Sequence, residues 1–253
     1  MRIVRFQSGR RIRYGVIAGD AVRELRGDPF RALAPTGGVF PLDRVRLLSP
    51  CLPSKVVAVG LNYAGHAREV RMAPPPEPIL FLKPSSAVIG PGDPIVYPLG
   101  VGRLDPEAEL AAVIGTAARN VPVSEAGRHI FGFTCLNDVT ARDLQARDKQ
   151  WTRSKSFDTF CPIGPWIETE IDPGNLAVRL RVNGETRQDS TTAGLIFPVA
   201  ELVSFISSVM TLAPGDVIAT GTPSGIAPVG IGDVVEVEIE GIGILRNTVI
   251  ASR

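Results

Sequence analysis

The chain has 253 residues, enough to bury a full hydrophobic core without stapling by disulfides. Its 27 Lys and Arg residues nearly equal its 26 Asp and Glu residues, so no net field attracts it to nucleic acid or to an anionic membrane. Composition therefore predicts neither a nucleic-acid partner nor a membrane partner.

Cysteine use and the N-terminus predict a cytoplasmic location. The three cysteines show no CxxC spacing, which favours a reducing compartment over a disulfide framework or a zinc site. The basic N-terminus lacks the apolar run and small-residue cleavage site of a signal peptide. No stretch reaches the roughly 18 uncharged apolar residues that a membrane span needs.

Residues 2 to 25 alternate between apolar and polar positions and contain glycine turns, which predicts two or three short strands. The next stretch, DPFRALAPTGG, carries two prolines and two adjacent glycines and is expected to be loose. An apolar strand, KVVAVGL, then begins after two further prolines, so we place a boundary between Leu48 and Pro53. The sequence thus predicts a small β-rich domain over residues 1–50 and a second domain over residues 51–253.

The second domain is predicted to be rich in strands. Strand-like runs occur at PILFL, DPIVYP, AELAAVIG, WIET, LAVRLRVNG, DVIATG and VVEVEIEGIG. The segment EAGRHIFGF is ambiguous, whereas VAELVSFISSVMTL spaces its apolar residues by three and four and ends before Pro214. This spacing predicts a helix at about 198 to 211, and the predicted fold class is α+β, dominated by sheet.

Glu107 and Glu109 stand two apart where the strand AELAAVIG begins, so strand geometry points both carboxylates to one face. Two like charges repel, and a buried pair needs a proton or a cation. Asp138, in FTCLNDVTARD, supplies a third oxygen ligand, and three carboxylates without nearby His or Cys suit Mg²⁺, Mn²⁺ or Ca²⁺. The alternative is a solvated strand face with Asp138 capping a turn, and spacing alone does not separate the two.

His66 lies in VGLNYAGHAREV, after a predicted strand and a turn, with Glu69 three positions later. If a helical turn forms there, the two side chains share one face, and the carboxylate orients the imidazole. Such a pair acts as a general base or activates a water molecule. The alternative is a surface histidine in a loop.

Arg142 and Gln145 stand three apart just after the third carboxylate, and Lys155 begins the stretch KSFDTFCPIGPW. Close to a metal, the planar guanidinium of Arg and the point charge of Lys could bind a carboxylate and a 2-oxo group. Ordinary surface positions are the alternative for these side chains.

The segment PGDVIATGTPSGIAP places Thr220, Gly221 and Thr222 at the end of a predicted strand. Hydroxyl and backbone N–H groups in that position can bind an anion. The segment is not a phosphate loop, because the Gly-Lys-Ser/Thr ending is missing.

Eight strings occur in order and together resemble the fumarylacetoacetate hydrolase family: GLNYAGHAREV, PILFLKPSSAVIGPGDPI, RLDPEAELAAVIG, NDVTARDLQ, KSFDTFCPIGPW, VNGETRQ, TLAPGDVIATGTPSG and GIGILRN. The resemblance runs from about Lys55 to the end. The N-terminal part is similar to the small domain that precedes the catalytic domain in the bacterial hydroxyheptadienedioate isomerase-like branch. The resemblance implies a mixed β-roll around a Mg²⁺ or Mn²⁺ site, in a homodimer.

The resemblance also implies roles for matching residues. The family's metal carboxylates correspond to Glu107, Glu109 and Asp138, and its catalytic His and Glu correspond to His66 and Glu69. Its substrate-binding residues correspond to Arg142, Gln145, Lys155 and Thr222. Of these, Lys155 also corresponds to a catalytic residue of the family. The segment REVRMAPPPEP is similar to a mobile lid that brings the His–Glu pair to the metal.

Two departures from the family pattern are present. Thr140 stands where many members carry Ser, which keeps the hydroxyl. The stretch from Gly60 to Tyr63 lacks the additional metal-binding Asp of the animal enzymes. The chain therefore resembles the smaller acylpyruvase and isomerase members.

The resemblance implies a Mg²⁺- or Mn²⁺-dependent hydrolase that cleaves the C–C bond of a β-diketo 2-oxo acid, of the acylpyruvate or fumarylpyruvate type. His66, oriented by Glu69, would activate the water, and the enolate of pyruvate would leave. Isomerisation of 2-hydroxyhepta-2,4-diene-1,7-dioate, or decarboxylation of an oxo acid such as oxaloacetate, is the alternative at the same site. A non-catalytic binding domain is the second class of hypothesis, which metal-dependent turnover of a 2-oxo acid would exclude.

Overall fold

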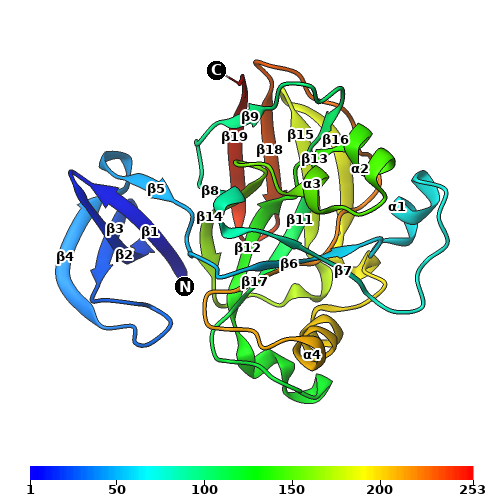
Figure 1. The fold of residues 1–253 in the computed structure, drawn as a ribbon. Coiled ribbons are helices and arrows are strands. Elements are labelled where there is room, and N and C mark those ends of the chain that lie inside the picture. The colour runs from blue at the N-terminus through cyan, green and yellow to red at the C-terminus, as the bar shows by residue number, and fades with distance from the viewer. Residues whose placement is uncertain (253) are drawn as a thin grey trace.

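The computed structural model describes residues 1–252, in which two β-sheets pack together with short helices around them (Figure 1). This arrangement confirms the expected α+β fold dominated by sheet. None of the helices in residues 1–252 combines the length and the apolar character needed to cross a membrane.

The larger sheet contains 12 strands. Two of its members branch from the main path, because β5 (Arg46–Leu48) pairs with β1 and β8 (Val88–Ile89) pairs with β14. The main path runs in the order β4 (Pro35–Pro41), β3 (Ala21–Leu25), β2 (Arg11–Ala18), β1 (Arg2–Ser8), β14 (Cys161–Glu168), β12 (Ile130–Asn137), β11 (Ala108–Ile114), β17 (Val217–Ala219), β6 (Val56–Gly60) and β7 (Ile79–Lys83).

The remaining elements form a second sheet, a short strand pair and several helices and turns. The five-stranded sheet has the order β16 (Glu185–Thr191), β15 (Ala177–Val182), β18 (Val234–Ile239), β19 (Gly243–Ala251) and β9 (Ile95–Tyr97). A separate pair joins β10 (Leu104–Asp105) to β13 (Thr140–Ala141). The α-helices are α1 (Ala64–Glu69), α2 (Arg142–Asp148), α3 (Thr152–Lys155) and α4 (Val199–Val209). Short 3₁₀ turns occur at Leu42–Arg44, Ser85–Ala87, Val123–His129, Pro173–Asn175 and Thr192–Gly194.

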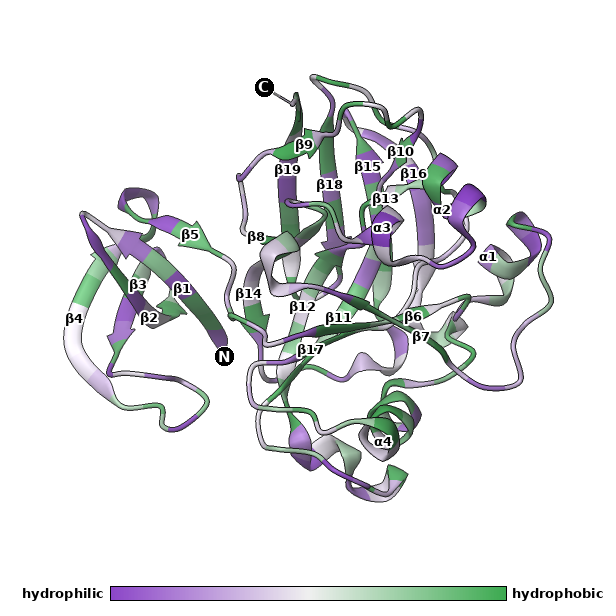
Figure 2. Ribbon diagram, viewed as in Figure 1, coloured by the Kyte–Doolittle hydropathy of each residue, from purple (hydrophilic) through white to green (hydrophobic). Residues whose placement is uncertain are grey.

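Strand β11 lies between β12 and β17 in the larger sheet, and all seven of its residues are buried. Except for Glu109 these residues are hydrophobic, and Figure 2 colours the ribbon by hydropathy. Leu110 and Ala112 pack into the cluster that contains the second sheet and α4, whereas Ala111 and Val113 pack into the cluster on the other face. Glu109 shares the face of Ala111 and Val113, because side chains alternate along a strand. The fold therefore encloses this carboxylate instead of leaving it in solvent.

The N-terminal strands form as predicted, but the expectation of a loose stretch before residue 39 is wrong in its second half. Residues Pro35–Pro41 form β4, which pairs with β3 at Val22 and Phe40. Because β4 is the edge of the sheet, its two terminal prolines remove few ladder hydrogen bonds. Gly37 takes a positive φ of 89°, which accommodates the irregular register there.

The division near residue 50 stays a prediction. The expected boundary follows β5 (Arg46–Leu48), and Figure 1 shows the first strands set to one side of the molecule. However, β1 pairs with β14 through Arg2 and Glu168, so one sheet continues through both parts.

The predicted helix and the ambiguous segment both lie in regular secondary structure. The predicted helix near 198 to 211 is α4 (Val199–Val209). The ambiguous segment EAGRHIFGF divides into the end of a 3₁₀ turn and the start of β12. Strand β12 was not predicted because its residues are almost all apolar and lack a clear alternation.

Candidate metal centre

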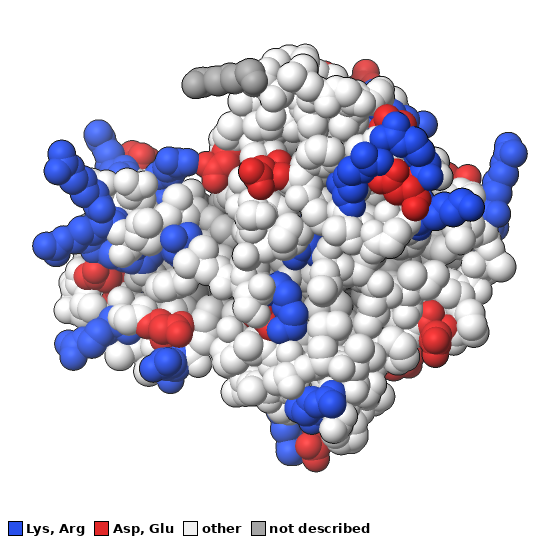
Figure 3. All heavy atoms as spheres, in the orientation of Figure 1, with Lys and Arg blue, Asp and Glu red and all other residues white. Residues whose placement is uncertain are grey.

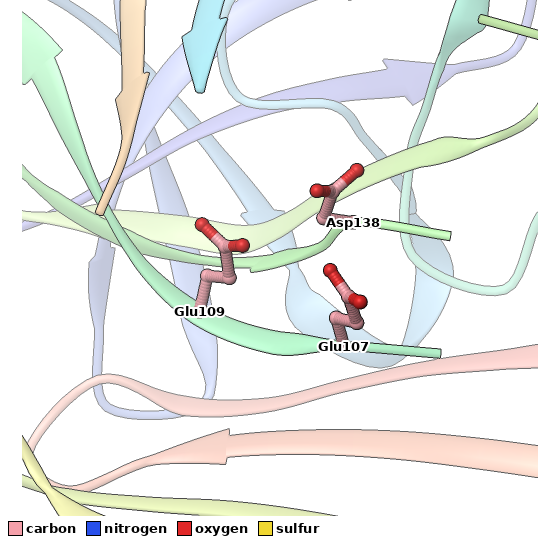
Figure 4. Close-up of side chains that lie close together, drawn as sticks. All are labelled: Glu107, Glu109 and Asp138. Carbon is pink, nitrogen blue, oxygen red and sulfur yellow. The ribbon is translucent and has the colours of Figure 1, made fainter. Parts of the chain in front are cut away.

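The three predicted metal carboxylates converge at the adjoining ends of two paired strands. Glu107 directly precedes β11 and Glu109 lies within it, while Asp138 directly follows β12, the antiparallel neighbour of β11. One oxygen of each lies within 4.8 Å of the others, and Figure 4 shows the three side chains pointing together. They are 3%, 2% and 0% exposed, respectively, so the solvated-face interpretation is wrong.

Two cations neutralise Glu107. The Lys155 ammonium donates to Glu107 Oε2 at 2.8 Å and to Asp138 Oδ2 at 2.5 Å, and the Arg142 guanidinium pairs with Glu107 Oε1. Burial raises the pKa of Glu107, but Lys155 and Arg142 outweigh burial and hold that pKa well below its ordinary value. Burial conversely lowers the pKa of Lys155, but Asp138 and Glu107 outweigh it and raise that pKa. Both side chains therefore stay charged.

Glu109 has no such neutralising partner. Within residues 1–252 it forms no ion pair, and it accepts a hydrogen bond of 2.8 Å from the Gly221 N–H. Burial, followed by the charges of Asp138 and Glu107, raises its pKa well above the ordinary 4.5. An uncompensated carboxylate beside two others is a donor set that fits a divalent cation preferring oxygen, such as Mg²⁺ or Mn²⁺.

The raised pKa of Glu109 predicts a pH-dependent metal affinity. In the metal-free folded protein the protonated form of Glu109 is favoured. The protonated carboxyl therefore stabilises the fold fully below pH 4.5, the ordinary pKa, and this stabilisation is lost as the pH rises through the raised pKa. Protons therefore compete with the metal, and the affinity for Mn²⁺ is expected to rise with pH across that window. Calorimetric titration with Mn²⁺ in buffers of different ionisation enthalpy should detect proton release. An affinity independent of pH would contradict this coupling.

The predicted helical turn at His66 is present as α1 (Ala64–Glu69). His66 Nδ1 lies 3.1 Å from Glu69 Oε2, and the imidazole is buried, not exposed in a loop. The other carboxylate oxygen of Glu69 accepts a hydrogen bond of 3.0 Å from the Gly225 N–H. Glu69 thus orients the imidazole and also attaches α1 to the loop that follows β17.

A cavity of about 320 Å³ brings the predicted residues together. Glu69 contacts the imidazole of His66 but does not itself contribute to the wall. The polar part of the wall comes from the three carboxylates together with His66, Arg142, Gln145, Lys155 and Thr222. Arg142 Nη1 also donates to Gln145 Oε1 at 2.6 Å, which links the two predicted substrate-binding residues.

The apolar part of the cavity wall includes Val70, Met72, Phe81 and Trp151. The rings of Phe81 and Trp151 meet edge to face, with centroids 5.3 Å apart. A Cβ atom on Gly60 would lie 2.5 Å from Trp151 Cζ3, so the glycine is required for the ring to lie against β6. The Lys155 ammonium lies 5.1 Å from the centroid of the Phe81 ring, so the charged and the aromatic parts of the wall meet at these two residues.

The strand end at Thr220 to Thr222 binds a carboxyl group, but that group belongs to a side chain of the protein. The Gly221 N–H donates its hydrogen bond to the carboxyl group of Glu109. Thr222 Oγ1 donates to the Ala108 carbonyl at 2.9 Å and accepts from Gln188 Nε2 at 2.8 Å. The Thr222 hydroxyl thus fixes the loop against β11, and the role of this residue in binding substrate stays a prediction.

Sequence reasoning missed two buried charges. Lys83, at the end of β7, donates from Nζ to Asp138 Oδ1 at 2.5 Å. Asp105 accepts from Arg142 Nε at 2.9 Å and from Arg103 Nε at 2.8 Å. Two signals could have identified them: Asp105 extends the period-two pattern of carboxylates by one step, and Lys83 is a single charge that closes the apolar run PILFL.

Residues 55–250 match the family model for the C-terminal part of fumarylacetoacetate (FAA) hydrolase. The chain belongs to the fumarylacetoacetate hydrolase family. Residues 1–50 match a second model, described as Rv2993c-like, N-terminal. The family named from the sequence strings is thereby confirmed.

Members of the fumarylacetoacetate hydrolase family with different activities are similar to this chain. It is 45% identical to the mitochondrial oxaloacetate tautomerase FAHD2A of Bos taurus, over 87% of this chain and 74% of that protein. It is 46% identical to 5-carboxymethyl-2-hydroxymuconate delta-isomerase from Mycobacterium smegmatis, with full coverage of both chains and a TM-score of 0.95. It is 33% identical, again with full coverage, to maleylpyruvate hydrolase from Sphingobium sp. SYK-6 in complex with manganese(II) and pyruvate, with a TM-score of 0.85. The chain is thus an enzyme of a family with tautomerase, isomerase and hydrolase members.

Proposed function

We propose that this enzyme uses a divalent metal ion to interconvert the keto and enol forms of a small 2-oxo acid. One observation carries the proposal: three buried carboxylates within 4.8 Å of one another share a cavity with the His66 imidazole, which Glu69 orients. The names of two similar proteins, an oxaloacetate tautomerase and a delta-isomerase, describe proton shifts of this kind.

Glu107, Glu109 and Asp138 would hold Mg²⁺ or Mn²⁺. When bound, such an ion would act as a Lewis acid that polarises the oxo group of the substrate. The similar hydrolase that contains manganese(II) and pyruvate supports a 2-oxo acid as the ligand class.

The protein's own side chains would bind the substrate and move the proton. Arg142, Gln145 and Lys155 line the polar part of the cavity, where their N–H groups suit a carboxylate and the oxygen that gains charge in the enolate. With Nδ1 donating to Glu69, the His66 imidazole presents Nε2 as the group that takes a proton from C3 and returns it. Beyond C3, the substrate would lie against the apolar wall of Phe81 and Trp151.

Hydrolysis of a β-diketo 2-oxo acid, the first expectation from the sequence, is the second candidate. The buried pair of His66 and Glu69 favours it, because the same base could activate a water molecule held in the cavity. The similarity to maleylpyruvate hydrolase supports this reaction as well. The two candidates share the enolate and differ in the bond that breaks.

Direct assays separate the candidates. Purified full-length protein with Mn²⁺ would be given enol-oxaloacetate, the hydroxyheptadienedioate, acetylpyruvate and fumarylpyruvate. Tautomerisation removes the enol absorbance without releasing pyruvate, decarboxylation of oxaloacetate releases CO₂, and hydrolysis releases pyruvate together with a second acid. Failure to convert any of these acids with Mn²⁺ present would reject the proposal and revive the binding-domain hypothesis.

The homodimer implied by the family resemblance stays a prediction and forms part of this proposal. Analytical ultracentrifugation of the full-length chain would measure its mass in solution. A monomer at micromolar concentration would contradict it.

A further inference from the structure

Two buried lysines hold the carboxylate of Asp138, one on each oxygen. Lys83 Nζ donates to Asp138 Oδ1 at 2.5 Å, and Lys155 Nζ donates to Asp138 Oδ2 at the same distance. Lys83 is 0% exposed and also donates to the Val139 carbonyl at 3.3 Å. The carboxylate is therefore fixed from two directions by elements far apart in the sequence, namely β7 and α3.

The two lysines differ in their access to the cavity. Lys155 forms part of the cavity wall and also contacts Glu107, a second metal carboxylate. Lys83 is not part of that wall, and its one ion pair within residues 1–252 is with Asp138. A substrate can thus reach Lys155, whereas Lys83 can act on the site only through Asp138.

We propose that Lys83 is a positioning residue, which fixes the orientation of Asp138 as a metal ligand and remains its permanent counter-charge. The inference rests on the proposed metal site. Carboxylates that bind metals are commonly held by a second group, and loss of that group lowers metal affinity by about 10–100-fold. Lys155 is then free to leave the carboxylates and meet an anionic substrate, because Lys83 still compensates Asp138.

Binding of Mn²⁺ to the full-length protein, followed by electron paramagnetic resonance, tests the role of Lys83 without an activity assay. Lys83→Met is expected to weaken Mn²⁺ binding by about 10–100-fold. Methionine fills similar space but offers neither the charge nor the hydrogen bond, so Asp138 loses one of its two anchors. If this variant fails to fold, Lys83→Gln keeps a donor in the buried position and is expected to weaken Mn²⁺ binding in the same direction.

Lys55→Met is the matched control. Lys55 also pairs with a buried aspartate, Asp216, and its side chain is 23% exposed, but it does not contribute to the cavity wall. Its loss should lower the melting temperature while leaving the affinity for Mn²⁺ unchanged. The control therefore separates a general loss of stability from an effect on the metal site.

Unchanged or tighter Mn²⁺ binding in folded Lys83→Met would overturn the positioning role, because orientation would then matter less than removal of a positive charge. Equal weakening in Lys55→Met would overturn it as well. If the wild-type protein binds no Mn²⁺, the proposed metal site itself is wrong. The positioning role of Lys83 is then rejected as well. Weakening in the Lys83 variants alone would support the inference.

Discussion

Glu109→Gln is expected to abolish Mn²⁺ binding and, at the same time, to raise the melting temperature of the metal-free protein. The carboxylate is buried, receives a hydrogen bond from Gly221, and has a pKa raised by burial and by its two acidic neighbours. A neutral amide removes that unfavourable charge, but it also removes a metal ligand. The loss of affinity should exceed the roughly 10–100-fold that outer-shell partners cost.

Thermal unfolding with and without Mn²⁺ measures both effects of Glu109→Gln. For a chain of this size, each kcal/mol of added stability raises the melting temperature by about 2–4 °C. Glu185→Gln, at a largely exposed carboxylate, is the control and should change neither quantity. If Glu109→Gln still binds Mn²⁺, Glu109 is not a metal ligand. If the metal-free variant has a lower melting temperature than the wild-type protein, the Glu109 carboxylate does not destabilise the fold.

His66→Ala is expected to reduce turnover of the 2-oxo acid by about 10²–10⁴-fold, the usual contribution of a general base. Binding of Mn²⁺ should be unchanged, because His66 contacts Glu69 and is not among the three clustered carboxylates. Steady-state rates and Mn²⁺ titration of the same preparation would measure the two properties.

His129→Ala is the matched control for the loss of His66. The only other histidine in the chain lies near Thr116, outside the cavity wall, and its loss should leave turnover unchanged. Full activity in His66→Ala would reject the assigned base. Loss of Mn²⁺ binding in that variant would instead place the imidazole in the metal site.

The distribution of surface charge agrees with the neutral balance of the sequence. Figure 3 shows Lys and Arg interspersed with Asp and Glu on the visible face, with several basic side chains on the N-terminal strands. The charged groups of the candidate metal centre differ from these, because Glu107, Asp138 and Lys155 are buried. Composition alone therefore carries no information about them.

Local patterns in the sequence predicted most strands and the helix α4, whereas the resemblance to the family was needed to choose Glu107, Glu109 and Asp138 as metal ligands. They succeeded where a short-range rule applies: alternation along a strand places Glu107 and Glu109 on one face, and a three-residue spacing in a helical turn joins His66 to Glu69. Among the strands that they missed are β4 and β12, where edge pairing and burial on both faces replace a clear alternation, and also β16 and β19.

The sequence by itself determined the family, the β-rich fold and the residue types of the site. Only the tertiary structure decided that Glu107 and Glu109 are buried, since the same spacing also suits a solvated strand. The structure also brought Lys83 and Asp138 together across 55 positions of the chain. Burial and long-range ion pairs depend on which strands become neighbours in the sheet, and a local pattern does not contain that information.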